Sequence, residues 1–213
     1  MKTTSSRYAG TTLPVAIKKW LEESYPSLID EDINALVEFC ENKLFKIQDN
    51  IKEFKKKYGE YPPALSIPKR FAEIKNINTN KVEKWQTTLG DELGRIKNLF
   101  YGDEKRKAGF EKPELFFVWY LMQKKECAYC GISETECREA VENLSKKFKS
   151  ERIRGLHLEV DRQNPKGPYS DKNCVLSCYF CNNDKSDRFD SEEYKKFLYA
   201  REEYLRSIIR KDK

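Results

Sequence analysis

The sequence predicts a mainly helical α+β protein in which a helical N-terminal region precedes a smaller module of two strands and helices. Three observations predict it: apolar residues recur every three or four positions through the first half, they alternate with polar residues at 156–161, and two Cys-x-x-Cys pairs flank that alternation. We expect residues 1–12, which are rich in Ser and Thr, to be flexible, residues 13–112 to form the helical region, and residues 113–213 to form the module.

The N-terminal region shows the periodicity of amphipathic helices. Its clearest pattern predicts one long helix that Asp30 caps and the turn at 58–63 ends. Shorter helices are expected around 68–74, 82–99 and 113–123, and the last is apolar on nearly every side, so we expect it to be buried and to pack two parts of the molecule together. The apolar face of the long helix would comprise Ile33, Leu36, Val37, Cys40, Leu44, Ile47, Ile51 and Phe54.

The C-terminal half carries strand and turn signals. Alternation at 156–161 predicts a half-buried strand, the segment 164–168 reads as a loop, and 173–177 predicts a short second strand. A helix is expected over 181–189 and a final helix over 191–209. The order strand, strand, helix therefore follows from the sequence pattern.

Composition limits the class of protein. The chain has 213 residues, of which 36% are charged, and no run approaches about 18 apolar residues, so we expect no membrane span. The N-terminus lacks the apolar stretch of a secretory signal, which predicts a cytoplasmic protein with reduced thiols. Aromatic residues make up 13% of the chain and favour a folded core. The net charge, 41 − 35 = +6, is compatible with a polyanionic partner.

Two cysteine pairs predict a metal site. Cys127 with Cys130, and Cys178 with Cys181, each offer two thiolates at a spacing that lets both sulfurs reach one ion, so together they predict a structural four-cysteine zinc site. A redox Cys-x-x-Cys would stand alone in a thioredoxin-like context, which nothing in the sequence suggests. The remaining cysteines read as small hydrophobic residues; they are Cys40, Cys137 and Cys174.

The segment between and after these pairs resembles the HNH endonuclease family. The resemblance rests on the sequence at 158–165, on Gly167 and on the sequence at 173–185, and it covers about residues 120–190. The zinc-stapled arrangement is similar to the subset of the family that includes phage endonuclease VII. In this family a β-hairpin and the following helix hold one divalent ion and cut nucleic acid.

The resemblance implies a role for each matching residue. Asp161 and Asn182 would supply oxygen ligands to Mg²⁺ or Mn²⁺, the kind of hard cation that neutralises charge on a phosphodiester. Asn173 would brace the hairpin or orient the general base. Lys185 and Arg188 would face the nucleic-acid backbone. Without the resemblance, Asp161 and Asn182 would read as a strand-end turn and a helix N-cap.

One position departs from the family pattern. Arg162 stands where the family has its general-base histidine, and arginine does not release its proton near neutral pH. Three alternatives stay open. The single histidine, His157, could serve as the base beside Glu159, which would then be the metal acid; or Glu159, another carboxylate or the substrate could activate the water while Arg162 clamps the phosphate; or the site is inactive.

The sequence thus predicts a metal-dependent HNH endonuclease that hydrolyses phosphodiester bonds, with DNA favoured over RNA and restriction or phage defence as its setting. Zinc would be structural and Mg²⁺ or Mn²⁺ catalytic. The helical region would bind the substrate or a partner, and specificity would come from it or from a partner protein. A partner protein or a homodimer is the expected assembly. The alternative from another class is a catalytically inactive, zinc-dependent nucleic-acid-binding or protein-interaction module.

Overall fold

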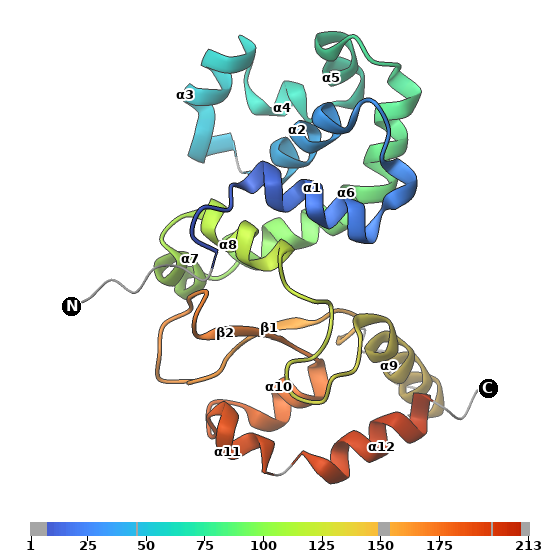
Figure 1. The fold of residues 1–213 in the computed structure, drawn as a ribbon, viewed down its shortest axis with the longest axis vertical. Coiled ribbons are helices and arrows are strands. Elements are labelled where there is room, and N and C mark those ends of the chain that lie inside the picture. The colour runs from blue at the N-terminus through green and yellow to red at the C-terminus, as the bar shows by residue number, and fades with distance from the viewer. Residues whose placement is uncertain (1–7, 46, 149–153, 197, 210–213) are drawn as a thin grey trace. The chain divides into compact units, whose positions relative to one another are not determined.

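The protein is described by a computed structural model that covers residues 8–45, 47–148, 154–196 and 198–209. The chain divides into two compact units, Met1–Met122 and Gln123–Lys213 (Figure 1). The helix expected at 113–123 therefore belongs to the N-terminal unit, whereas we expected the C-terminal module to start at residue 113. No helix among the described residues combines the length and apolar character needed to cross a bilayer.

The N-terminal unit is helical throughout its described part. The 23-residue helix α6 packs against α2 and α5, while α8 packs against α1, α6 and α7. The elements are α1 (Leu13–Ser24), η1 (Pro26–Leu28), α2 (Ile33–Leu44), α3 (Ile47–Tyr58), α4 (Pro62–Leu65), α5 (Pro68–Lys75), α6 (Thr79–Tyr101), α7 (Glu104–Phe110) and α8 (Pro113–Leu121).

Aromatic side chains fill the core of this unit. The ring of Phe39 on α2 lies 5.6 Å from that of Phe71 on α5 and 6.0 Å from that of Trp85 on α6. Helix α8 is buried along six consecutive residues, 116–121. The prediction that this segment is buried is confirmed. Helix α8 packs against α1, α6 and α7 of its own unit, and these contacts cover its apolar sides.

The predicted single long helix is wrong, because the chain forms α2 and α3 instead. Phe45 follows α2 in an extended conformation with φ −84° and ψ 146°, and its buried ring lies 5.7 Å from that of Phe117 on α8. Breaking the helix thus buries an aromatic side chain. The start also differs: Asp32 is the N-cap residue, and the carboxylate of Asp30 accepts the backbone N–H of Asp32 and pairs with Lys81 at 2.7 Å.

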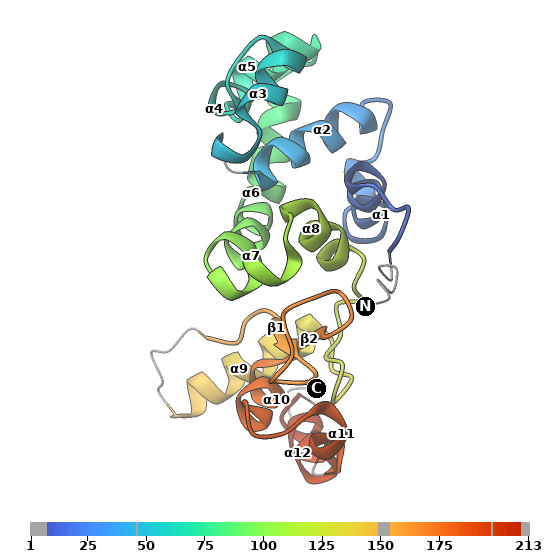
Figure 2. The same cartoon turned by 90° about the vertical axis from the view of Figure 1, so that its left-hand side faces the viewer.

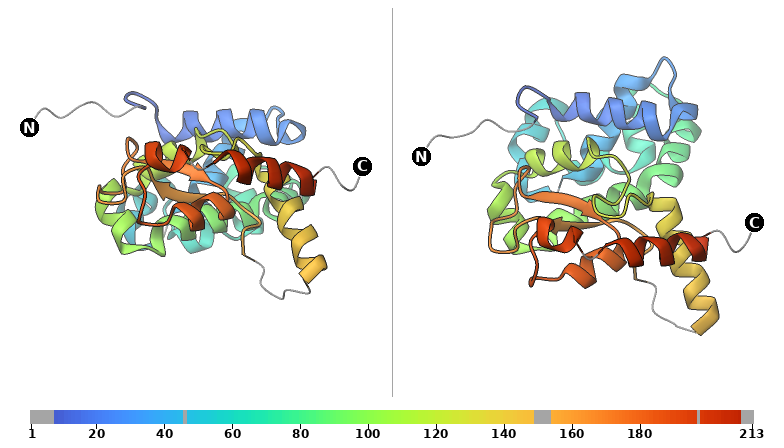
Figure 3. Two further views of the ribbon diagram at one scale, coloured as in Figure 1. Left: turned by 90° about the horizontal axis from the view of Figure 1, so that it is seen from below. Right: turned by 60° about the horizontal axis from the view of Figure 1, so that its bottom comes forward.

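The C-terminal unit combines helices with one two-stranded antiparallel sheet. β1 (Glu159–Arg162) pairs with β2 (Cys174–Ser177), with Glu159 opposite Ser177. Helix α10 (Tyr179–Lys185) follows β2 and packs against β1 (Figure 2). The fold-class prediction, mainly helical α+β with a hairpin followed by a helix, is confirmed. The other helices of the unit are α9 (Glu134–Phe148), α11 (Ser191–Lys195) and α12 (Tyr199–Ile209), and α12 packs against α9 (Figure 3).

Two helices of this unit differ from the sequence prediction. Helix α9 was not predicted, although Ser133 and Glu136 form a capping box at its start: the Glu136 carboxylate accepts the Ser133 N–H at 2.7 Å, and Ser133 Oγ accepts the Glu136 N–H at 3.2 Å. The predicted helix over 191–209 is split. Helix α11 ends in a tighter turn, in which backbone hydrogen bonds join residues three positions apart. Lys196 N donates to Glu193 O, and Leu198 N donates to Lys195 O.

Candidate functional site

Four buried sulfurs form a candidate metal centre in the C-terminal unit. The Sγ atoms of Cys127, Cys130, Cys178 and Cys181 all lie within 4.8 Å of one another, and Cys130 Sγ is 3.8 Å from Cys178 Sγ. Tetrahedral zinc with Zn–S bonds of about 2.3 Å requires sulfurs about 3.8 Å apart. The donor set and its spacing therefore fit a metal ion such as zinc.

Backbone hydrogen bonds build this centre. Gly131, at φ +71°, turns the chain after the first pair and donates its N–H to Cys127 O at 2.9 Å. Ala128 N donates to Leu176 O at 2.8 Å, which ties the first pair to β2. Cys178 is the N-cap of α10, and its Sγ accepts the Cys181 N–H at 3.4 Å. The centre therefore fastens the hairpin to the helix that follows it.

The four neighbouring thiols shift one another's pKa. Hydrogen bonds from Cys130 and the other thiols lower the pKa of Cys127, while the thiols of Cys127 and its neighbours raise the pKa of Cys178. Four thiolates this close repel one another strongly, so a dication that neutralises them belongs to the chemistry of the set. Metal binding at this centre would release protons.

A second polar cluster lies where β1 meets α10. Glu159 Oε2 accepts a hydrogen bond from Asn182 Nδ2 at 2.6 Å, and Glu159 Oε1 accepts one from Arg154 Nε at 3.2 Å. The side chain of Glu159 is 23% exposed. The structure therefore brings together a partly exposed carboxylate and an amide, which are the ligand types that hard cations prefer.

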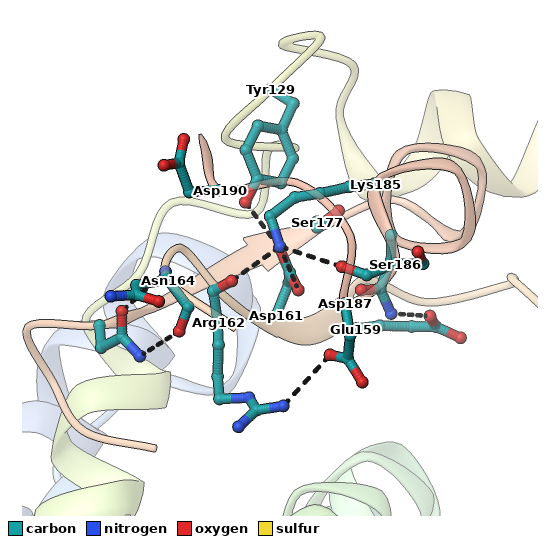
Figure 4. Close-up of polar contacts among 12 residues, drawn as sticks. Tyr129, Glu159, Asp161, Arg162, Asn164, Ser177, Lys185, Ser186, Asp187 and Asp190 are labelled. Atoms are coloured by element: carbon teal, nitrogen blue, oxygen red, sulfur yellow. Dashed lines mark hydrogen bonds and ion pairs between the residues drawn. The ribbon is translucent and has the colours of Figure 1, made fainter. Parts of the chain in front are cut away.

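Asp161, the other acid of β1, lies in a buried ion pair. Lys185, with a fully buried side chain, places Nζ 3.2 Å from Asp161 Oδ2, and Tyr129 OH donates to the same oxygen at 2.6 Å. Lys185 Nζ also donates to Arg162 O at 2.8 Å (Figure 4). Burial raises the pKa of Asp161, while the hydrogen bond from Tyr129 and the charge of Lys185 act to lower it.

These contacts change two expectations about the site. Asn182 is hydrogen-bonded to Glu159, whereas the sequence interpretation paired Asn182 with Asp161 as metal ligands. Lys185 was expected to face a nucleic-acid backbone, and this is wrong because its side chain is 0% exposed and its ammonium bonds inside the unit. Buried charges need partners, and Asp161 supplies one.

The Asp161–Lys185 pair is expected to be important for stability. Asp161→Ala leaves an unpaired buried ammonium and is expected to cost about 3–5 kcal/mol, whereas the double variant Asp161→Leu with Lys185→Met is expected to be close to wild type. Amide hydrogen exchange of the C-terminal unit in each variant measures both free-energy changes. A cost below about 1 kcal/mol for Asp161→Ala would show that the ammonium finds another partner.

Arg162 holds the loop that joins the two strands. Its Nη1 donates to Gly167 O at 3.2 Å, its Nη2 lies 3.2 Å from Asp187 Oδ1, and its guanidinium lies 4.9 Å from the centre of the Tyr169 ring. The side chain is 18% exposed. These contacts give Arg162 a bracing role within the unit.

Asn173 and Arg188 differ in their surroundings. Asn173 Nδ2 donates to Asn164 O at 3.0 Å and to Pro168 O at 2.8 Å, and its Oδ1 accepts the Asn164 N–H at 2.9 Å, which braces the loop. Arg188 lies after α10 and is exposed. Of the three basic residues expected at a nucleic acid, Arg188 is thus the one with an exposed side chain.

His157 lies outside the sheet. β1 begins at Glu159, so the expectation that the strand over 156–161 includes His157 is wrong. The chain bends at His157, and the Leu158 N–H bonds to the Glu134 carboxylate at 2.9 Å instead of to a strand. His157 Nδ1 lies 3.3 Å from Glu134 Oε1, and the imidazole is 40% exposed.

The comparison with solved structures found one that is similar to this chain. No protein-family profile and no curated protein matches the sequence. The chain is similar to the HNH restriction endonuclease PacI, which is described as rare-cutting and as perturbing DNA, with 29% identity over 52% of this chain and 76% of that chain and a TM-score of 0.38. That score falls short of a shared overall fold, so functional assignment depends on the residues of the site.

Sequence interpretation missed several polar residues of this site. Tyr129, between the first two cysteines, gave no signal, because only the tertiary structure brings it to Asp161. Glu134 lies in the first turn of α9, and the capping-box pattern of Ser133 and Glu136 could have located that helix in the sequence. Gly155, just before β1, is a local signal of a positive φ next to the charged Arg154.

Proposed function

We propose that this protein is an HNH-type nuclease that hydrolyses phosphodiester bonds of nucleic acid, DNA in preference to RNA, with a divalent cation. The observation that carries the proposal is the contact between Glu159 on β1 and Asn182 on α10, at the junction of a hairpin and a helix fastened by four cysteines. We assign zinc to the four cysteines as a structural ion.

Glu159 and Asn182 are the proposed ligands of Mg²⁺ or Mn²⁺. Rotation of the Asn182 amide about its terminal bond exchanges the NH₂ group and the carbonyl oxygen, which presents two oxygen donors to one ion. When bound, such an ion neutralises charge that develops on the phosphoryl group and the leaving oxygen. Asp161, in this proposal, supports the cluster through its ion pair with Lys185.

Proton removal from the attacking water needs a base other than Arg162. Glu159 is the partly exposed carboxylate of the cluster, and His157, two residues earlier, presents a 40% exposed imidazole oriented by Glu134. Either group can serve as a general base where it lies within hydrogen-bond reach of the attacking water. His157→Ala separates them: loss of cleavage assigns the base to His157, and retention assigns it to Glu159 or to the substrate.

A zinc-dependent binding module without catalysis is the second candidate. Two observations favour it: Arg162 occupies the usual histidine position and braces a loop, and Asp161 is neutralised by Lys185. Such a module would still present the exposed Arg188 and Arg154 to a polyanion. The helical N-terminal unit would, in either case, supply specificity or contacts with a partner protein or second copy, in restriction or phage defence.

Cleavage of defined substrates tests the proposal. Supercoiled plasmid, a linear duplex, single-stranded DNA and RNA are incubated with the purified chain and Mg²⁺, Mn²⁺ or EDTA. We expect Mg²⁺- or Mn²⁺-dependent nicking of DNA that EDTA abolishes and Glu159→Gln removes. Binding of DNA without cleavage under every metal condition would instead support the binding module.

A further inference from the structure

Arg154 carries an exposed positive charge directly beside the proposed ion-binding pair. Its Nε donates to Glu159 Oε1 at 3.2 Å, while Asn182 bonds to the other oxygen of the same carboxylate. The Arg154 side chain is 62% exposed. A guanidinium carries five N–H donors, so the contact through Nε leaves the four donors on Nη1 and Nη2 without a bond to the described residues.

Contacts of Arg154 and of the next residue, Gly155, hold the arginine in place. Its guanidinium lies 5.3 Å from the centre of the Tyr179 ring on α10, in a cation–π contact. The next residue, Gly155, has φ +94°, and a Cβ there would lie 2.7 Å from Tyr179 Cβ, so only glycine lets the chain pass this close to α10. Cys137 Sγ donates to Gly155 O at 3.3 Å. The position of Arg154 is thus fixed by the backbone, by an aromatic ring and by Glu159.

A guanidinium held in this position is suited to bind a phosphate. Its terminal N–H groups form a planar fork that matches two oxygens of a phosphate. Less side-chain entropy is lost on binding because Tyr179 and Glu159 already contact the guanidinium. An ion held by Glu159 and Asn182 would attract the same phosphate from the other side of the carboxylate. Arg162, by contrast, has its terminal nitrogens bonded to Gly167 and Asp187.

We propose that Arg154 binds the phosphate that the nuclease cleaves, with Tyr179 and Gly155 as its positioning residues. The inference depends on the proposed function and deepens it, since it assigns the substrate's anionic group to a named side chain. Arg154, and not Arg162, is then the arginine that contacts the substrate.

The test compares Arg154→Gln, Arg154→Lys and the matched control Arg138→Gln, which removes the same charge from an exposed position on α9. Duplex DNA binding is measured in EDTA over a range of salt concentrations, and cleavage is measured with Mn²⁺. For Arg154→Gln we expect the salt slope of binding to fall by about 1 and kcat to fall about 10²–10³-fold. Arg154→Lys should restore the slope and only part of kcat, and Arg138→Gln should match wild type.

Other outcomes overturn the inference. If Arg154→Gln binds and cleaves as Arg138→Gln does, Arg154 does not contact the phosphate. If Arg154→Gln loses cleavage but keeps the wild-type salt slope, Arg154 acts only by positioning Glu159. If the wild type never cleaves, the proposed function fails, and the binding measurements in EDTA still decide whether Arg154 contacts a phosphate. Thermal melting of each variant confirms that it is folded.

Discussion

Cys178→Ser is expected to unfold the C-terminal unit and to release its metal ion. Cys178 is both a proposed zinc ligand, with its sulfur 3.8 Å from that of Cys130, and the N-cap of α10. Structural zinc contributes apparent binding free energies of about 10–16 kcal/mol in zinc-finger peptides, as much as the whole stability of a typical domain, about 5–15 kcal/mol. Zinc content per chain and amide hydrogen exchange of residues 123–213 measure the loss.

The control for this variant lies in the other unit. Cys40→Ala removes a buried sulfur that is not one of the four clustered cysteines, and it is expected to leave zinc content unchanged. Helices of the N-terminal unit should keep their exchange protection in Cys178→Ser, because the chain divides into two compact units. One equivalent of zinc on purified Cys178→Ser, or none on the wild type, would contradict the zinc assignment.

Glu159→Gln is expected to lower cleavage about 10²–10⁴-fold, which corresponds to about 3–5 kcal/mol of transition-state stabilisation. The substitution keeps an oxygen that can accept the hydrogen bond from Asn182, so the fold is expected to survive. What it removes is the negative charge that would bind the ion. Initial rates at several Mn²⁺ concentrations, together with thermal melting, measure the two effects separately.

Glu139→Gln, at an exposed position on α9, is the matched control and is expected to cleave as wild type does. Replacement of Asn182 sharpens the test: Asn182→Asp keeps an oxygen donor and should retain cleavage, while Asn182→Leu should lose it. A folded Glu159→Gln with wild-type rates would remove Glu159 from the ion site. Asp161 would then be the acid to test, by the double variant with Lys185.

The two acids of β1 have different surroundings and therefore different expected roles. Glu159 is partly exposed and bonded to groups that can turn toward a ligand, while Asp161 is buried and tied to Lys185 and Tyr129. An acid that must bind a cation needs access to solvent. An acid that neutralises a buried ammonium must itself be buried.

Local sequence patterns determined much of the protein. Apolar periodicity predicted α5 and α6 because packing of one helix face is a local property of the chain, and a nearly continuous apolar segment predicted the buried α8. Each Cys-x-x-Cys pair sets two sulfurs at metal-binding spacing within four residues, and alternation located the strand to within a few residues. The break between α2 and α3 escaped prediction, because Phe45 gains its burial from Phe117, which is distant in sequence.

What the sequence alone determined, then, is the four-cysteine centre, the order strand, strand, helix, and the candidate acids Glu159 and Asp161. Only the tertiary structure decided which acid meets Asn182. The acids lie on one strand face about 6.6 Å apart, and Asn182 and Lys185 lie about 4.5 Å apart along α10. Either pairing satisfies these spacings, so the direction of α10 against β1 decides, and it places Asn182 on Glu159 and Lys185 on Asp161.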